Sequence, residues 1–141
     1  MSINNKPLRS KKYFKQMNKP LWIKLVAVSG FLVVALGAFG AHALETVLTV
    51  QRIQTFHTAV QYQSFHTLAL LGIVCVPDEL LQSNWKCYAA RSLLLGIGLF
   101  CGSLYLLALT DIKTFTMITP LGGISFLMAW IFFLAAVLKA R

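Results

Sequence analysis

The sequence has few acidic residues. Only four Asp and Glu occur against 13 Lys and Arg in 141 residues, and none of the four precedes Glu45. Charged residues make up 12% of the chain, whereas a soluble domain has about 25%. Hydrophobic residues make up 57%, and the mean hydropathy is +0.71. A soluble protein of this composition would aggregate, so the composition points to a membrane protein.

The sequence also lacks the motifs of common enzymes and metal sites. It contains no GxSxG, HExxH or P-loop pattern and no pair of carboxylates inside an apolar run. The four acids lie in or beside connecting segments: Glu45, Asp78, Glu79 and Asp111. The three cysteines have no spacing typical of a disulfide framework or a zinc site: Cys75, Cys87 and Cys101. We therefore expect no catalysis, cofactor or metal; an integral membrane enzyme is the less favoured alternative.

Four apolar stretches dominate what is present. They cover about residues 21–41, 55–76, 92–110 and 119–138. Each approaches the roughly 20 residues that a helix needs to cross a bilayer. Pro77 ends the second stretch, and Pro120 suits the first turn of the fourth. The sequence therefore predicts an all-α fold, a polytopic membrane four-helix bundle over residues 21–141, preceded by a basic cytoplasmic arm over residues 1–20.

The basic residues are unevenly distributed, which predicts the orientation of the bundle. Seven lie in the first 24 positions, and a cytoplasmic N-terminus places eleven of the 13 inside. Only Arg52 and Lys113 then lie outside, so both termini are expected to be cytoplasmic. A basic block ahead of an apolar run is a topogenic signal rather than a nucleic-acid-binding face. Five lysines are expected to contact lipid headgroups: Lys11, Lys12, Lys15, Lys19 and Lys24.

A secretory signal peptide is the alternative for the first stretch. The basic start, the apolar run and the "AHA" at Ala41–Ala43 imitate one with its cleavage site. The apolar core of a signal peptide has about 7–15 residues. The run from Leu25 to Ala41 is longer, which favours a retained membrane helix.

Glycines recur on three of the four stretches. Gly98 and Gly102 form a GxxxG pattern, which lets helix backbones approach closely. The positions predicted to pack helices together are Gly30, Gly37, Gly40, Gly98, Gly102, Gly122 and Gly123. The same faces would also suit a homo-oligomer or a larger membrane complex.

The second stretch carries unusually many polar side chains, in "QYQSFHTLALL" from Gln61 to Leu71. A polar group without a partner in hydrocarbon costs several kcal/mol. We therefore expect protein or water around Gln61–His66 and a lipid-compatible surface from Leu68 onward. The other stretches place polar residues at the same depth, which gives a candidate polar cluster of His42, Gln61, Tyr62, Gln63, His66, Ser103, Tyr105 and Thr119.

Two interpretations of this cluster remain open. It is either a hydrogen-bond network that fixes helix packing or a polar cavity in the outer half of the bundle for a small molecule, quinone headgroup, lipid or protons. Proton and cation transporters usually carry an acid inside a span, and this chain has none there. A metal or haem site is disfavoured, because His57 and His66 lie nine residues apart and face opposite sides of one helix.

Four segments in order resemble one family of small membrane proteins. "ALGAFGAHAL", "YQSFHTLALLG", "LFCGSLYLLALT" and "TPLGGISFLMAW" together look like the YgdD family of four-helix bacterial inner-membrane proteins, which is related to a vertebrate transmembrane family. The resemblance covers about Lys24 to Leu138 and includes Gly37, Gly40, His42, Tyr62, Gln63, His66, Gly102, Ser103, Tyr105, Thr119, Pro120, Gly122 and Gly123. It implies a multi-pass inner-membrane protein of uncharacterised function, with no catalytic residues to transfer. We expect a non-enzymatic accessory or interaction subunit; the alternative is a small-molecule, quinone or lipid-binding carrier.

Overall fold

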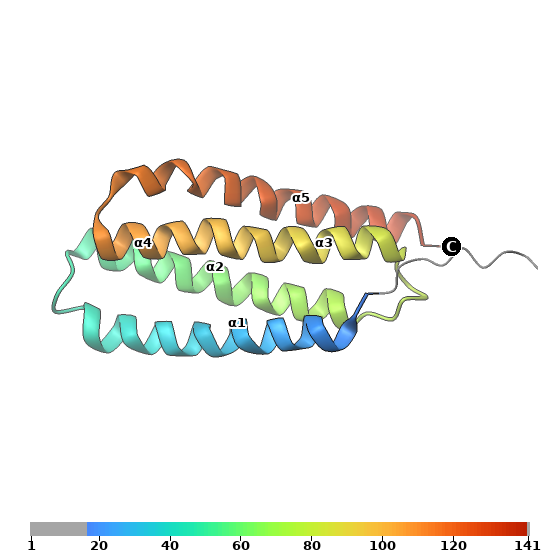
Figure 1. The fold of residues 1–141 in the computed structure, drawn as a ribbon, viewed down its shortest axis with the longest axis horizontal. Helices are drawn as coiled ribbons and strands as arrows, with labels where there is room; N and C mark the ends of the chain where they lie inside the picture. The colour runs from blue at the N-terminus through green and yellow to red at the C-terminus, as the bar shows by residue number, and fades with distance from the viewer. Residues whose placement is uncertain (1–16, 141) are drawn as a thin grey trace, which may run out of the picture.

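The computed structural model describes residues 17–140, and these form antiparallel helices lying side by side (Figure 1). Helix α1 covers Lys19–Phe39 and continues through a π-helical turn, η1, at Gly40–Leu44. Helix α2 covers Val50–Cys75. Helix α3, Ser83–Gly96, passes through a second π-helical turn, η2, at Ile97–Cys101 into α4, Gly102–Thr110. A 3-10 turn, η3, at Lys113–Met117 leads to α5, Thr119–Leu138.

The first helix begins two residues before the predicted stretch. Asn18 caps it, since its side chain accepts a hydrogen bond from the Leu21 backbone N–H at 3.3 Å, and Pro20 fits the first turn. Met17 is buried in the core. The last residues of the predicted basic arm therefore belong to the bundle, and residues 1–16 lie outside the described part.

The third helix begins at Ser83, well before the predicted residue 92. Gln82 is its cap, because the Gln82 side chain accepts a hydrogen bond from the Trp85 N–H at 3.0 Å. Lys86 and Ala89 are fully buried in its first turns. This segment looks polar in the sequence, which is why no helix was predicted there. Figure 1 shows that it forms a helix lying along α5.

Three helical segments are long and apolar enough to cross a membrane: Lys19–Leu44, Ser83–Thr110 and Lys113–Leu138. Helix α2 is not among them, although it has 26 residues. Its polar residues lower its hydropathy, which is why composition alone does not establish the predicted second span.

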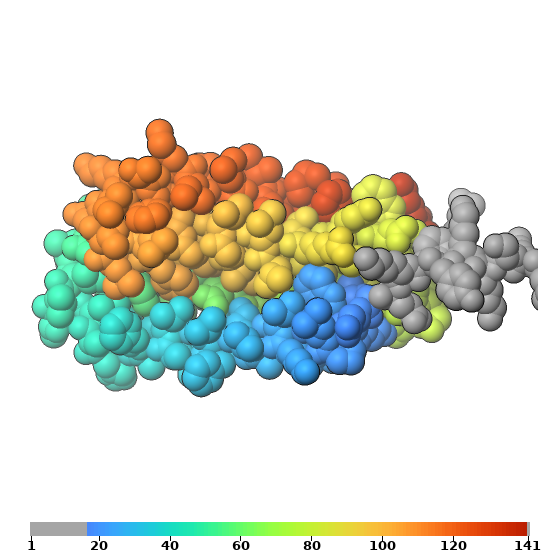
Figure 2. All heavy atoms as spheres, in the orientation of Figure 1, coloured from blue at the N-terminus to red at the C-terminus, as the bar shows by residue number. Residues whose placement is uncertain are grey.

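The helices pack as two pairs, α1 on α2 and α3 on α5, with α2 also lying against α3, η2 and α4. The main core is built around Trp22, Leu70, Leu93 and Phe126. Between α1 and the α3–α4 rod the surface is hollowed, and α2 is visible at the bottom of the hollow (Figure 2). The bundle is therefore less closed along this side.

The glycines divide into packed and unpacked positions. A Cβ added at Gly122 would lie 2.6 Å from the Phe100 Cα, and one at Gly96 would meet the Phe126 ring. Gly37 and Gly40 lie against α2 side chains, and Gly123 is in loose contact with Phe100. By contrast, Gly30, Gly98 and Gly102 have nothing within 4 Å of an added Cβ. The prediction that these three pack helices together within the chain is wrong, and Gly96 takes that role instead.

Candidate functional site

A buried hydrogen-bond network joins α1, α2 and α4. The Ser29 and Thr67 hydroxyls lie 2.7 Å apart, and Gln63 Nε2 donates to the Ser29 carbonyl oxygen at 3.3 Å. The Tyr105 hydroxyl donates to Gln63 Oε1 at 2.8 Å. Gln63 and Thr67 are one turn apart on α2, so both reach Ser29. The network satisfies Gln63 and Thr67, two of the polar side chains of α2, from inside the bundle.

Ser29 was missed by the sequence analysis, because a lone serine in an apolar helix gives no signal of its own. The spacing of Gln63 and Thr67 was the available clue, since residues four apart share a helix face. Such a pair needs a hydrogen-bonding partner, and one polar residue at the same depth on the neighbouring helix can supply it.

A second, separate contact joins α4 to α5. The Ser103 hydroxyl lies 2.8 Å from the Thr119 hydroxyl and donates to the Phe100 carbonyl oxygen at 3.0 Å. Thr119 is the first residue of α5; because Ser103 donates its proton to Phe100, the Thr119 hydroxyl donates to Ser103, and the Phe115 carbonyl oxygen lies 3.3 Å from it. This pair ties α4 to the start of α5.

His66 lies among aromatic rings. Its imidazole stacks on Phe126, with ring centroids 3.5 Å apart and an interplanar angle of 9°. Phe65 meets its edge at 5.1 Å, and Tyr62 stacks at 5.8 Å. His66 Nδ1 donates to the Tyr62 carbonyl oxygen at 2.8 Å, so in the neutral ring Nε2 is the acceptor. The aromatic contacts fix the plane of the imidazole.

Beside His66 is a hollow of about 410 Å³, lined by Gln61, Tyr62, Phe65 and His66. Within residues 17–140, no buried side-chain nitrogen or oxygen lacks a hydrogen-bond partner. His66 Nε2 makes no hydrogen bond there, although the residue is only 5% exposed, so this atom must reach the surface. The hollow therefore has one acceptor nitrogen and aromatic walls.

The candidate polar cluster does not form a single group. Gln63 and Tyr105 form one network, Ser103 and Thr119 another, and Tyr62 and His66 an aromatic group. His42 is exposed in the π-helical turn after α1, away from all three groups. Gln63 and His66 are buried, whereas Gln61, Tyr62 and Phe65 are exposed, so this chain covers only part of the segment that was expected to face protein or water.

A buried ion pair lies beyond the C-terminal end of α2, where it joins the α2–α3 connection to α3. The Lys86 side chain is fully buried, and its Nζ donates to Asp78 Oδ1 at 2.7 Å and to the Val76 carbonyl oxygen at 2.5 Å. Lys19 Nζ lies 3.6 Å from the other carboxylate oxygen of Asp78. The hydrogen bond from Lys86 holds the pKa of the Asp78 carboxyl below its ordinary value of 3.8. In the sequence Lys86 is only one of the eleven basic residues expected on the cytoplasmic side, and nothing near it indicates that it is buried.

Among the lysines expected to meet lipid headgroups, Lys24 is exposed on α1 and Lys19 is half-buried beside Asp78. The other three, Lys11, Lys12 and Lys15, lie outside the described residues. At the far end, Arg52 Nε and Nη2 donate to the carbonyl oxygens of Ala108 and Leu109, each at 2.7 Å. Arg52 therefore caps the C-terminus of α4.

Comparison with known proteins places the chain in a family. A family model described as "Protein of unknown function (DUF423)" matches residues 36–123. The chain is 38% identical over 125 residues to the UPF0382 inner membrane protein YgdD of Escherichia coli K12, which covers 89% of this chain and 95% of that protein. It is 40% identical over 119 residues to the UPF0382 membrane protein YwdK of Bacillus subtilis 168, which covers 84% of this chain and 97% of YwdK.

A UPF0382 membrane protein of Haemophilus influenzae is 42% identical over 113 residues, covering 80% of this chain and 90% of that protein. No solved structure matches the chain. The family match spans more than half of the chain, from the end of α1 through the polar segment of α2 to the first turn of α5. The chain therefore belongs to the DUF423, or UPF0382, family of membrane proteins of unknown function.

Proposed function

We propose that the protein is a four-span protein of the bacterial inner membrane in which α2 is the fourth span. The support is the way α2 meets its polar needs: Gln63 and Thr67 face α1 and α4, where they are bonded, while Phe65 and Leu68 are exposed. A helix with its polar groups bonded inside the bundle can present an apolar surface to lipid. The E. coli relative is named an inner membrane protein, which agrees with this location.

Both termini are proposed to be cytoplasmic. The start of α1, the α2–α3 connection and the end of α5 lie at one end of the bundle (Figure 1). Within residues 17–140, five basic residues belong to this end and two to the other. Reporter fusions at Ala140 and Lys113 test the orientation: a C-terminal phosphatase fusion should be inactive and one after Lys113 active. The reverse pattern would overturn the proposal.

Its function is proposed to be non-enzymatic association with another membrane protein, in the manner of an accessory subunit. The observation that supports this is the position of the GxxxG pair: within residues 17–140, nothing lies within 4 Å of a Cβ added at Gly98 or Gly102. Leu95 and Leu106, which lie on the same face by helical spacing, are exposed. Close backbone approach at small residues is a main source of helix association in lipid.

The test is native mass spectrometry of the protein extracted in mild detergent, with and without a Gly98→Leu, Gly102→Leu double substitution. The unmodified chain is expected to retain a partner or a second copy, and the double variant to be a monomer. Gly72→Leu is the matched control, because Gly72 also has nothing within 4 Å but lies on α2. A monomer for all three proteins, or loss of the partner in Gly72→Leu, would overturn the proposal.

A second candidate function rests on the hollow at His66. Its size of about 410 Å³ lies within the range of about 300–1,000 Å³ found for small-molecule sites. The aromatic walls and the Nε2 acceptor suit a flat ring that carries a hydrogen-bond donor, as in a reduced quinone headgroup. This supports a carrier function in the outer half of the bundle.

This candidate predicts that an organic extract of the purified protein contains an ultraviolet-absorbing small molecule at close to one per chain. His66→Ala should remove it by opening the stack on Phe126, whereas His57→Ala, on another face of α2, should not. Equal amounts of the molecule in both variants would contradict the site.

A further inference from the structure

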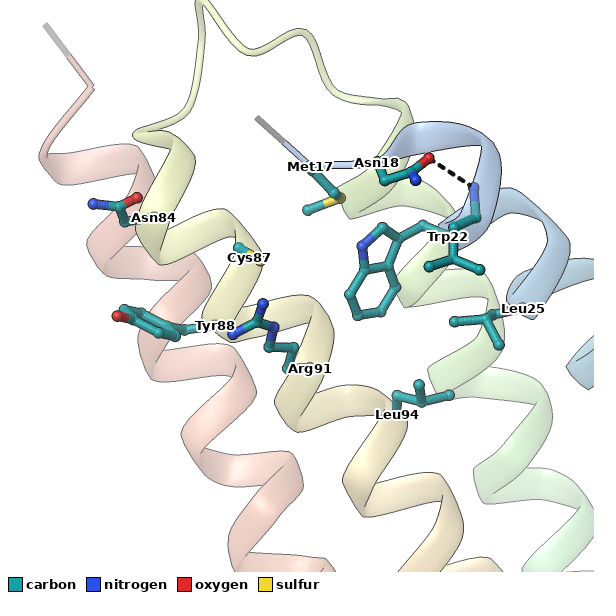
Figure 3. A pocket seen from close by; sticks show the side chains of 10 residues that line it. Met17, Asn18, Trp22, Leu25, Asn84, Cys87, Tyr88, Arg91 and Leu94 are labelled. Carbon is teal, nitrogen blue, oxygen red and sulfur yellow. Dashed lines mark hydrogen bonds between the residues drawn. The ribbon is translucent and has the colours of Figure 1, made fainter. Parts of the chain in front are cut away.

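A second hollow, at the end of the bundle where α1 begins, is unlike the one at His66. It has a volume of about 430 Å³ and lies between α1 and α3 (Figure 3). Helix α1 contributes Trp22 and Leu25, and helix α3 contributes Arg91 and Leu94. Because α1 packs mainly on α2, nothing in the described chain fills this space.

Two hydrogen-bond donors of this hollow, on Arg91 and Trp22, have no partner within the described residues. Within residues 17–140, Arg91 makes no ion pair and no side-chain hydrogen bond. The Trp22 indole Nε1 also makes none, and since no buried polar atom there is unpartnered, this atom must be accessible. In Figure 3 the Trp22 ring projects from α1 toward α3, and the Arg91 guanidinium lies on α3 on the side of Tyr88. The amides of Asn18 and Asn84 stand at the rim.

The walls below these donors are apolar. Leu25 and Leu94 line the hollow, and a shallower hollow of about 350 Å³ continues along α3 past Leu95, Gly98 and Leu99. Arg91 and Leu94 line both hollows, so the two share a wall. The combined surface has one cationic donor group at the end of the bundle and a hydrocarbon track leading from it toward the middle.

No acidic side chain lines the hollow. Of the two acids that precede α3, Asp78 is already held by Lys86 and Lys19, and Glu79 is exposed and does not line the hollow. The positive charge of Arg91 is therefore unbalanced by the described chain. A guanidinium binds a phosphate through two parallel N–H groups, and Trp and Tyr side chains such as Trp22 and Tyr88 suit the membrane–water interface.

We propose that this hollow binds one anionic phospholipid, with its phosphate on Arg91 and an acyl chain along Leu25 and Leu94. Charge complementarity and the apolar track together select a lipid over a soluble phosphate. The lipid belongs to the leaflet at the end where α1 begins. It covers the open side of the bundle, where α1 and α3 do not meet, and is separate from the His66 hollow.

The test uses the full-length protein in mild detergent, titrated with phosphatidylglycerol or with phosphatidylcholine of the same acyl chains and followed by native mass spectrometry. One phosphatidylglycerol is expected to bind per chain, at least tenfold more tightly than phosphatidylcholine. Arg91→Ala should weaken phosphatidylglycerol binding roughly tenfold or more, which corresponds to about 1.4 kcal/mol for a charge-assisted contact. Arg91 contacts no other described side chain by hydrogen bond or ion pair, so this variant should fold.

Lys24→Ala is the matched control, because Lys24 is an exposed cation on α1 that does not line the hollow. It should leave binding unchanged; an equal loss in both variants would show diffuse surface attraction and overturn the site. Leu94→Trp keeps the guanidinium but fills the apolar wall, and it should also weaken binding. Equal affinity for the two lipids, or unaltered binding in Arg91→Ala, would equally overturn the proposal.

The reactivity of Cys87 can report whether the lipid occupies the hollow, since Cys87 lines the hollow and is a half-buried, free thiol. With the exposed Cys75 replaced by serine, alkylation of Cys87 by a maleimide should slow severalfold on adding phosphatidylglycerol and stay unchanged with phosphatidylcholine. Glycerol 3-phosphate, which has the headgroup phosphate without acyl chains, should give no protection. Full protection by that soluble probe would overturn the part of the proposal that assigns the apolar track.

Discussion

Replacing Asp78 by Asn removes the carboxylate that neutralises a fully buried ammonium group. The Lys86 side chain is only 1% exposed, and Asp78 Oδ1 accepts from its Nζ at 2.7 Å. Removing one partner of a buried ion pair costs about 3–5 kcal/mol, because the other charge is left without compensation. Asp78 is itself 21% exposed and Lys86 keeps the Val76 carbonyl oxygen, so we expect Asp78→Asn to lower the free energy of unfolding by about 2–3 kcal/mol.

The matched variant is Lys86→Met, which removes the buried charge and keeps most of the side-chain volume. Asp78 then retains Lys19 at 3.6 Å and partial contact with solvent. We expect a smaller loss of about 1 kcal/mol, since exchanging a buried charge for an apolar side chain is often nearly neutral. The double variant should resemble Lys86→Met rather than the sum of the two losses.

The assay is reversible unfolding of the full chain in mixed detergent micelles with increasing sodium dodecyl sulfate, followed by tryptophan fluorescence. The folded-state pKa of Asp78 lies below its ordinary value of 3.8, so its stabilisation is present above that pH and is lost as the pH falls further. The unmodified chain should lose stability on acidification below about pH 4 by an amount that Asp78→Asn lacks. Additive losses, or an Asp78→Asn variant within about 0.5 kcal/mol of the unmodified chain, would refute the reasoning.

Three further predictions concern the helix contacts. Gly122→Ala should destabilise the bundle by about 1–3 kcal/mol through overpacking, whereas Gly102→Ala should be neutral or stabilising by up to about 1 kcal/mol, as the same unfolding assay measures. Tyr105→Phe leaves Gln63 Oε1 without its donor and should cost about 0.6 kcal/mol, less if Gln63 is already Leu. Arg52→Ala removes two bonds to the end of α4 and should raise hydrogen exchange in that last turn, with little change elsewhere.

The sequence predicted the helical class and the ends of the fourth helix, because a long apolar run followed by Lys139 leaves few alternatives. It did not find the start of α3. The run "NWKCYAAR" contains two basic residues, and only its packing shows that Lys86 is buried against Asp78 while Arg91 is exposed. A contact between two charged residues outside the apolar run, such as Lys86 and Asp78, leaves no recognisable pattern in the local sequence.

The polar residues of α2 were identified but not their partners. Helical spacing places Gln63 and Thr67 on one face, yet it says nothing about which neighbouring helix covers that face. For the same reason the GxxxG pair could not be assigned: the pattern marks a surface that permits close approach, and only the tertiary arrangement shows that Gly98 is open.

The network that joins Ser29 to α2 has a consequence for how the chain enters the membrane. Synthesis proceeds from the N-terminus, so α1 is made before α2. Ser29 is therefore already in place when Thr67 and Gln63 arrive, and both can bond to it within the first hairpin. Tyr105 supplies its hydrogen bond only after α4 is made. Helix α2 can therefore bond to Ser29 of α1 as soon as it inserts. Tyr105 of α4 adds the last hydrogen bond of the network when the α4–α5 hairpin follows.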